Sequence, residues 1–324
     1  MKRSKKLLLL FTGILLMTAG IWLAIYGRNT IPPGKSYVAL ITKSTESAFW
    51  QSVYAGASAA ATEYNLDVTL EGPDSEEDYV TQNRMIAQAV ERGARAIIFS
   101  AVDYNANSEA ISQAARSGVK IVVIDSDVNS SQVNCRIGTD NRAAGRMAGE
   151  AVLRSTEEKL YIGIVNHDIN SANGQQREEG FREAALKDKR VEVMYTINVA
   201  STTEDARAGT TQLLKEHPEI NAVVTFNEWT SLGVGWAIRD LELADSTQVV
   251  AFDSNVVSVG MLETGEVDAL IVQNPYAMGY LGVEQANNLM SGNGQTEKQI
   301  HTATTCVTRE NMYDLECQRI LFAF

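Results

Sequence analysis

The sequence of 324 residues predicts an α/β fold, with two doubly wound parallel-sheet units behind one N-terminal transmembrane helix. Three observations predict it. An uncharged apolar run occupies residues 7–26, short β-branched runs alternate with helical patterns from residue 37 to 125, and a second such series starts at residue 161. The chain is also longer than one hydrophobic core usually supports, so two units are expected.

The first element is a predicted membrane anchor. Residues 7–26 carry no charge and follow a basic segment, residues 1–6, which the pattern places in the cytoplasm. Twenty residues rising about 1.5 Å each span roughly 30 Å, the thickness of the bilayer's hydrocarbon core. No small-residue cleavage site or lipobox cysteine follows, which favours an uncleaved single-pass anchor over a removed signal peptide. Residues 27–36 then form a linker, and the remainder is expected on the extracytoplasmic side.

The charge of the remainder limits its partners. Residues 1–30 contain five Lys/Arg and no Asp/Glu, which leaves 23 basic against 40 acidic side chains, a net charge of −17. Nucleic acid or an anionic membrane surface would require a basic face, so neither is expected as a partner.

The first α/β unit alternates strands with helices. Its predicted elements are Tyr37–Thr42, Phe49–Tyr64, Val68–Leu70, Tyr79–Arg92, Ala96–Ser100, Asn107–Ser117 and Lys120–Asp125. The strands are continuous apolar runs, such as the one that begins at Ala96, which indicates burial on both faces and therefore a parallel sheet covered by helices.

The second unit repeats this organisation. Its predicted strands are Tyr161–Val165, Val191–Ile197, Ala222–Phe226, Val249–Asp253 and Ala269–Val272. A helix over 173–186 has charged residues on one side and Phe181 on the other, as a helix covering a sheet should. One strand of each unit ends in Asp-Ser, at Asp125 and Asp253, an echo that a structural cap would also explain.

Motifs for catalysis, cofactors or metals are weak. Gly34-Lys35-Ser36 resembles the end of a P-loop, but residue 29 is Asn and a strand follows where a helix is needed. His167, His217 and His301 are scattered, which gives no metal-ligand spacing. Cys135 fits a buried strand, whereas Cys306 and Cys317 could pair or remain two unrelated thiols. We expect no enzyme activity, cofactor or metal.

A ligand site is expected at the carboxyl ends of the strands, where open parallel sheets bind their ligands. The residues that follow the strands are polar or aromatic: Ser47, Phe49, Trp50, Ser100, Asp103, Asp125, Ser126, Asn227, Asp253 and Gln273. Short acceptors and amides beside two aromatic rings suit a polyhydroxylated ring, with hydroxyl groups to bond and C–H faces to pack.

At these residues the chain resembles the type I periplasmic binding proteins of the ribose/galactose-binding and LacI-like superfamily. The resemblance extends from Tyr37 to about Val307. Its carriers are Ala48-Phe49-Trp50, Val123-Ile124-Asp125, the run Ile137 to Asn141 with Gly145, Arg177 to Phe181, Phe226-Asn227-Glu228 with Leu232-Gly233, Val250 to Asp253, and Gln273-Asn274-Pro275 with Gly279. It implies a three-segment hinge near Thr139, Gln273 and Thr302, with lobes of 37–139 plus 274–302 and of 140–273 plus 303–324.

The resemblance also implies roles for the site residues. Phe49 and Trp50 would stack on the ligand, Asp125 and Asp253 would accept hydroxyl protons, and amide contacts would come from Gln175, Asn227 and Gln273, with Ser47 and Ser100 beside them. Alternatively, Phe49 could be core, the aspartates could cap turns, and Asn227 and Gln273 could serve the hinge. The sugar binders of this type carry Arg where this chain has Ser126 and Gln175, which removes two bidentate donors.

The expected function is a receptor that closes on a monosaccharide-like solute, a sugar or polyol, and presents it to an ABC sugar permease. The alternative is a membrane-tethered sugar sensor that signals to a histidine kinase or chemoreceptor. A transcription regulator has the same fold, but no helix-turn-helix is found and the membrane segment argues against it. A hydrolase has no motif in support.

Overall fold

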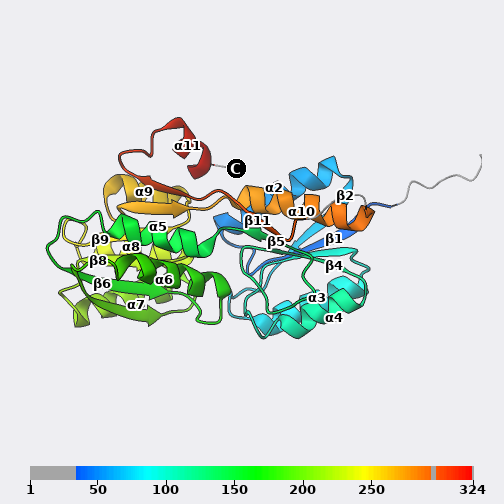
Figure 1. Ribbon diagram of the computed structural model, residues 1–324, viewed down its shortest axis with the longest axis horizontal. Helices are drawn as coiled ribbons and strands as arrows, with labels where there is room; N and C mark the ends of the chain where they lie inside the picture. Colours follow the sequence, from blue (N-terminus) through cyan, green and yellow to red (C-terminus); the bar gives the residue numbers. More distant parts are fainter. Residues whose placement is uncertain (1–33, 293–296, 323–324) are drawn as a thin grey trace, which may run out of the picture. The chain divides into compact units, whose positions relative to one another are not determined.

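The computed structural model describes residues 34–292 and 297–322. The predicted membrane segment, 7–26, and the preceding basic residues lie outside this range. Within the described residues, no helix combines the length and apolar character that crossing a bilayer requires. Residues 37–324 form one compact unit, and it contains two six-stranded sheets, each the centre of a lobe (Figure 1).

Lobe I is built on the sheet with strand order β2-β1-β3-β4-β5-β11. Strands β1, β3, β4, β5 and β11 are mutually parallel, as the continuous apolar runs predict. The elements are β1 Ser36–Ile41, α2 Ala48–Glu63, β2 Leu66–Glu71, α3 Tyr79–Glu91, β3 Ala96–Phe99, α4 Ser108–Arg116, β4 Lys120–Ile124, β5 Cys135–Gly138, α10 Pro275–Ser291 and β11 Gln299–His301.

Lobe II is built on the sheet with strand order β7-β6-β8-β9-β10-β12. Five strands are parallel, but β12 runs antiparallel to β10, so the expectation of a wholly parallel sheet is wrong at this edge. The elements are α5 Asn141–Val152, β6 Leu160–Asn166, α6 Ala172–Ala185, β7 Val191–Asn198, α7 Thr203–Glu216, β8 Ala222–Thr225, α8 Glu228–Asp240, β9 Gln248–Phe252, α9 Val256–Thr264, β10 Ala269–Val272, β12 Thr305–Thr308 and α11 Leu315–Leu321.

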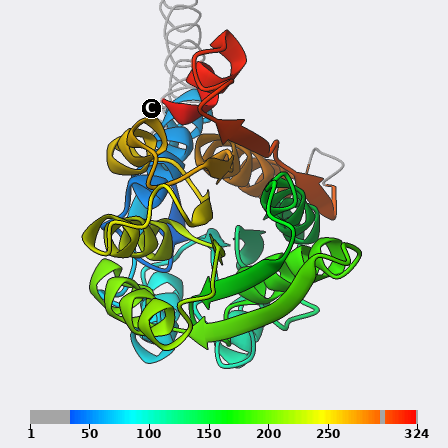
Figure 2. The ribbon, with the colours of Figure 1, turned by 90° about the vertical axis from the view of Figure 1, so that its left-hand side faces the viewer.

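Helices cover both faces of each sheet. In lobe II, α5 and α6 pack on one face, around Phe181, while α7, α8 and α9 pack on the other, around Leu214 and Ile238 (Figure 2). In lobe I, α2 and α10 cover one face, and α3 and α4 cover the other. Strands such as Ala96–Phe99 are therefore buried along their whole length, which is why their sequences do not alternate.

Glycines make very close helix crossings in each lobe. A Cβ atom on Gly145 of α5 would lie 2.0 Å from the carbonyl oxygen of Arg177 in α6, and one on Gly180 would lie 2.0 Å from that of Arg142. In lobe I, a Cβ on Gly56 of α2 would similarly meet the α10 backbone at 2.0 Å. Only glycine permits backbones to approach this closely.

The chain passes between the two lobes three times: after β5, after β10 and between β11 and β12. Two of these passages are bonded to each other, because the Thr139 hydroxyl donates to Oε1 of Gln273 at 2.8 Å. Because the chain leaves a sheet at the carboxyl end of β5 and of β10, the carboxyl edges of the two sheets lie close to each other.

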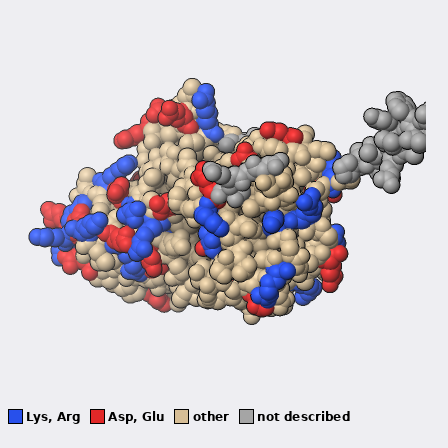
Figure 3. Space-filling view, turned by 45° about the vertical axis from the view of Figure 1, so that its right-hand side comes forward, with Lys and Arg blue, Asp and Glu red and all other residues tan. Residues whose placement is uncertain are grey.

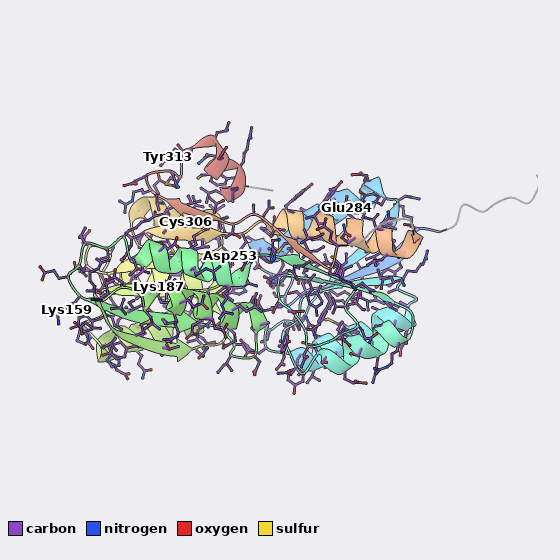
Figure 4. The ribbon with its side chains drawn as sticks, viewed as in Figure 1. Lys159, Lys187, Asp253, Glu284, Cys306 and Tyr313 are labelled. Carbon is purple, nitrogen blue, oxygen red and sulfur yellow. The ribbon has the colours of Figure 1, made fainter. Side chains whose placement is uncertain are left out.

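The three cysteines are free thiols. Cys306 on β12 packs with the α5–α6 side of the sheet (labelled in Figure 4), whereas Cys317 in α11 belongs to the core on the opposite side. The pairing that the sequence left open is therefore not formed in this structure. The face of the molecule in Figure 3 shows basic and acidic side chains interspersed.

Candidate functional site

A cavity of about 30 Å³ lies where the carboxyl ends of the two sheets meet. It is far smaller than the range of about 300–1,000 Å³ for small-molecule pockets, because the facing side chains of the two lobes fill most of the space. Asp253, one of its lining residues, lies where the two lobes face each other (Figure 4). The lining residues are Lys43, Ser47, Phe49, Trp50, Glu76, Asp125, His167, Asn173, Arg177, Asn227, Glu228, Trp229, Asp253 and Gln273.

Two aspartates occupy equivalent positions in the two lobes. Asp125 directly follows β4 and Asp253 directly follows β9. Both have left-handed backbones, with φ of 54° and 66°, and each donates its N–H to the neighbouring strand at 3.0 Å, to Ile137 and Ile271 respectively. A non-glycine residue in this conformation costs roughly 1–2 kcal/mol, a cost that is concentrated at functional sites.

The environment of Asp125 is rich in donors. Its carboxylate accepts from the Asn173 amide at 3.1 and 3.0 Å and from the Ser100 hydroxyl at 3.2 Å. The Arg177 guanidinium lies 3.5 Å away. Asn173 and Arg177 are in lobe II, so these contacts join the two lobes at the centre of the cavity.

Asp253 has fewer partners. Oδ1 accepts from the Gln273 amide at 2.7 Å, and only 5% of the residue is exposed. Burial raises the pKa of Asp253 to about 7, although Arg177 and the Gln273 bond favour its ionised form. At neutral pH this carboxyl group is therefore close to half-protonated.

Arg177 is held rigidly at the base of the cavity. It donates to Asn141 at 2.9 Å, to the Phe226 carbonyl at 2.6 Å and to Gln273 at 2.7 Å, and its guanidinium lies 4.9 Å from the centre of the Phe252 ring. Ser126 and Gln175 supply no guanidinium at the two positions where the sugar binders carry Arg. Arg177, at a third position, places one guanidinium at the cavity.

The aromatic pair comes from the start of α2. The Phe49 and Trp50 rings meet edge to face at 4.9 Å, and both belong to the lobe I core while also lining the cavity. Ser47 caps the helix by accepting from the Trp50 N–H at 3.2 Å. The Trp50 indole N–H donates to Glu76 at 2.9 Å. This bond and the contact with Phe49 together hold the orientation of the Trp50 ring.

Several hydrogen bonds connect the lobes across the cavity. The Lys43 ammonium donates to the Ser171 hydroxyl at 2.6 Å, and the Phe49 N–H donates to Glu228 at 3.0 Å. At the rim, the Ser201 N–H donates to Glu77 at 2.7 Å. These contacts describe a cleft closed by the protein's own side chains.

The structure brings together seven of the nine predicted site residues: Ser47, Phe49, Trp50, Asp125, Asn227, Asp253 and Gln273 all line the cavity. Ser100 lies behind it, bonded to Asp125. Asn227 caps α8 by accepting from the Thr230 N–H at 2.9 Å and also donates to Ser201 at 2.7 Å.

Gln175 does not line the cavity. Helix α6 directs Asn173 and Arg177, four residues apart, towards the cavity. Gln175 is two residues from each of them and points away, because two residues turn an α-helix by about 200°. Seven lining residues were not predicted: Lys43, Glu76, His167, Asn173, Arg177, Glu228 and Trp229. The helical period of α6 was the signal that could have found two of them.

Among the residues that the structure describes, no group of three or more His, Cys, Asp or Glu side chains could hold a metal ion. The cavity's chemistry is instead that of hydrogen-bond acceptors, two cations and aromatic rings.

Comparisons with known proteins agree with this architecture. The D-ribose/D-allose-binding protein of Pseudomonas aeruginosa is 25% identical over 291 residues, which cover 87% of this chain and 91% of that protein. The ribose import binding protein of Escherichia coli is 24% identical, covering 80% of this chain and 86% of the relative. These relatives bind or import sugars, and their names describe no catalysis.

Solved structures give the same result. A carbohydrate transporter solute-binding protein from Agrobacterium radiobacter, in complex with D-arabinose, superposes with a TM-score of 0.85 at 28% identity, covering 89% of this chain and 99% of that one. A sugar transporter from Clostridium phytofermentans is 31% identical, with a TM-score of 0.76 and coverage of 85% and 100%. The family described as the periplasmic binding protein domain matches residues 38–294, and this chain belongs to that family.

Proposed function

We propose that this protein binds a monosaccharide-like ligand, a sugar or polyol, in the cavity between its lobes and presents it to an ABC sugar permease. The observation that carries the proposal is the cleft between the lobes, which is lined both by two carboxyl groups at equivalent strand ends and by an aromatic pair. Carboxylates accept strong hydrogen bonds from hydroxyl groups, and aromatic faces pack on the C–H faces of sugar rings.

The ligand contacts in this proposal are specific. Asp125 and Asp253 accept from hydroxyl groups, Trp50 and Phe49 pack on the ring, and Asn227 and Gln273 supply amide contacts. The nearby Arg177 supplies the guanidinium donor. Relatives that bind D-ribose, D-allose or D-arabinose support a ligand of this class.

The proposal includes tethering. The uncharged run 7–26 behind a basic segment would hold the receptor on the extracytoplasmic face of the membrane, near its permease. Lobes of 37–139 plus 274–302 and of 140–273 plus 303–324 would close about the three chain passages.

The test is ligand-dependent thermal stabilisation of the full chain in mild detergent, with D-ribose, D-allose, D-arabinose, D-fucose and D-apiose as probes. At least one sugar should raise the melting temperature, since a ligand that binds only the folded state stabilises it. Asp125→Asn should lower affinity at least tenfold and lower the ligand-free melting temperature less than Asp125→Ala does, because Asn tolerates the left-handed backbone and keeps one oxygen that can accept from Asn173. Asp125→Ala, which cannot bond Asn173, is the comparison variant. Stabilisation by amino acids or nucleosides with no response to any sugar would contradict the proposal.

A further inference from the structure

His167 directly follows β6 and lines the cavity. It is not among the residues proposed above to contact the ligand. Only 1% of the residue is exposed. One ring nitrogen, Nε2, lies 3.3 Å from Oδ1 of Asn173. The other, Nδ1, is buried and has no hydrogen-bond partner among the residues that the structure describes. A buried polar atom without a partner is costly, which raises the question of what satisfies it.

The surroundings fix the orientation of the Asn173 amide. Its nitrogen faces both oxygens of Asp125, at 3.1 and 3.0 Å. Its oxygen faces the Ser171 hydroxyl at 2.7 Å and the Gly174 N–H at 2.9 Å. A flipped amide would direct its oxygen at a carboxylate and its nitrogen at another N–H, so only the observed orientation satisfies every group.

This orientation decides the tautomer of His167. Because Nε2 faces a carbonyl oxygen that only accepts, Nε2 must carry the proton. Burial, together with Lys43 and Arg177 nearby, lowers the pKa of His167 well below its usual value. The ring is therefore neutral at physiological pH, and Nδ1 presents a lone pair without a proton.

We infer that Nδ1 of His167 is a specificity-determining contact that accepts a hydrogen bond from an O–H or N–H group of the ligand. This inference rests on the proposed function. An uncharged acceptor differs from the neighbouring carboxylates because it cannot take up a proton and become a donor at neutral pH. It therefore discriminates against ligands that have a ring oxygen, a carbonyl or a bare C–H at this position, since two acceptors or an unpaired nitrogen would be left buried.

Two conservative substitutions separate this role from a structural one. In His167→Gln, the side-chain amide can replace the Nε2 donor to Asn173 but leaves no acceptor at the Nδ1 position. In His167→Asn, the shorter amide can place its oxygen near the Nδ1 position but loses the bond to Asn173. If Nδ1 contacts the ligand, His167→Gln should weaken binding at least tenfold while the ligand-free melting temperature stays close to that of the wild type, and His167→Asn should bind the more tightly of the two.

The experiment uses the full chain in detergent, with calorimetry against the five probe sugars and ¹⁵N spectra of protein labelled on histidine. The sequence contains three histidines, so the signals can be assigned by single substitutions at His217 and His301. Without sugar, the His167 ring should show the Nε2-protonated tautomer at pH 7. With the tightest-binding sugar, the Nδ1 resonance should shift as expected for an accepted hydrogen bond.

The outcomes distinguish this inference from the proposed function. Sugar binding with an unshifted Nδ1 resonance and full affinity in His167→Gln overturns the inference alone. An Nδ1-protonated or doubly protonated ring in the sugar-free protein also overturns it. If none of the five sugars binds, the sugar-binding function fails and the inference fails with it.

Discussion

Asp125 and Asp253 share a backbone conformation but differ in their surroundings. Both lie at the end of a buried strand with positive φ, and Asp125 receives bonds from Ser100 and Asn173, whereas Asp253 receives one from Gln273. Burial without enough donors raises the pKa of Asp253 to about 7. A ligand hydroxyl would supply the missing donor, which couples ligand binding to proton release.

This coupling predicts a pH dependence of binding. A hydroxyl donates more strongly to the carboxylate than to the protonated acid, so sugar affinity should increase severalfold from pH 6 to pH 8. Calorimetry in buffers with different ionisation enthalpies should detect the released proton. Asp253→Asn should bind more weakly at pH 8 and lose most of this dependence. An equal slope in wild type and variant would assign the titration to another group.

The free energy of unfolding of the ligand-free protein should change with pH in the opposite direction: the contribution of Asp253 decreases as pH rises, whereas sugar affinity increases. Since the folded pKa of Asp253 exceeds its unfolded value of about 3.8, this group favours folding at low pH, and that contribution is lost as pH rises towards about 7. The difference in unfolding free energy between wild type and Asp253→Asn, measured by urea titration at several pH values, isolates this contribution.

At the scale of elements, the glycine crossings fix how the helices pack. Gly145 allows α5 to approach the α6 backbone, and any Cβ there would overlap a carbonyl oxygen that cannot move independently of its helix. The same helix carries Asn173 and Arg177 into the cavity. The crossing therefore contributes both to stability and to the position of two lining residues.

Gly145→Ala should destabilise the protein by about 1–3 kcal/mol, the usual cost of overpacking, as measured by urea unfolding. The matched control is Gly260→Ala in α9, where a Cβ would meet nothing within 4 Å. There the substitution should be neutral or stabilising by about 0.4–1 kcal/mol, because alanine restricts the unfolded chain. Equal effects at the two positions would mean that the α5–α6 crossing can adjust without cost.

Much of the fold and of the candidate site could be predicted from the sequence, and the parts that could not be predicted have physical reasons. Continuous apolar runs such as Ala96–Phe99 predict buried parallel strands, and the α/β fold with two sheets follows. The direction of β12 was not predictable, because the four residues Thr305–Thr308 have no periodicity that distinguishes antiparallel from parallel pairing. In the candidate site, the residues that directly follow a strand, such as Asp125 and Asp253, could be predicted from the sequence. Glu76 lies in a loop beyond β2, and its position depends on tertiary contacts with Trp50 and Ser201.

At the scale of the whole molecule, the lobes are connected by their own hydrogen bonds as well as by the chain. The Ser201 N–H bonds Glu77 at the rim, outside the residues that line the cavity. Lys43 bonds Ser171 inside it. These bonds stabilise the arrangement of the two lobes seen here, so the proposed ligand would have to enter while they are broken.

Glu77→Ala should accelerate sugar dissociation by about three- to tenfold, in line with roughly 0.5–1.5 kcal/mol for one hydrogen bond, while the association rate changes little. Stopped-flow measurements with the tightest-binding probe sugar check this. Glu158→Ala, which removes an exposed carboxylate before β6, is the charge-matched control and should leave both rates unchanged. Unaltered dissociation in Glu77→Ala would show that the rim bond does not hold the cleft shut.

The three passages between the lobes also bear on how the protein is made. Lobe I requires α10 and β11, which follow the whole of the second sheet's parallel strands in the sequence, and lobe II requires β12. Lobe I is incomplete until the ribosome has added β11, which ends at His301, and lobe II until it has added β12 and α11, which ends at Leu321. An emerging chain that stops after β5 leaves the Gly56 face of α2 without its α10 partner. The polypeptide must therefore remain unfolded or partly folded through most of its synthesis, and its final fifty residues complete both lobes almost together.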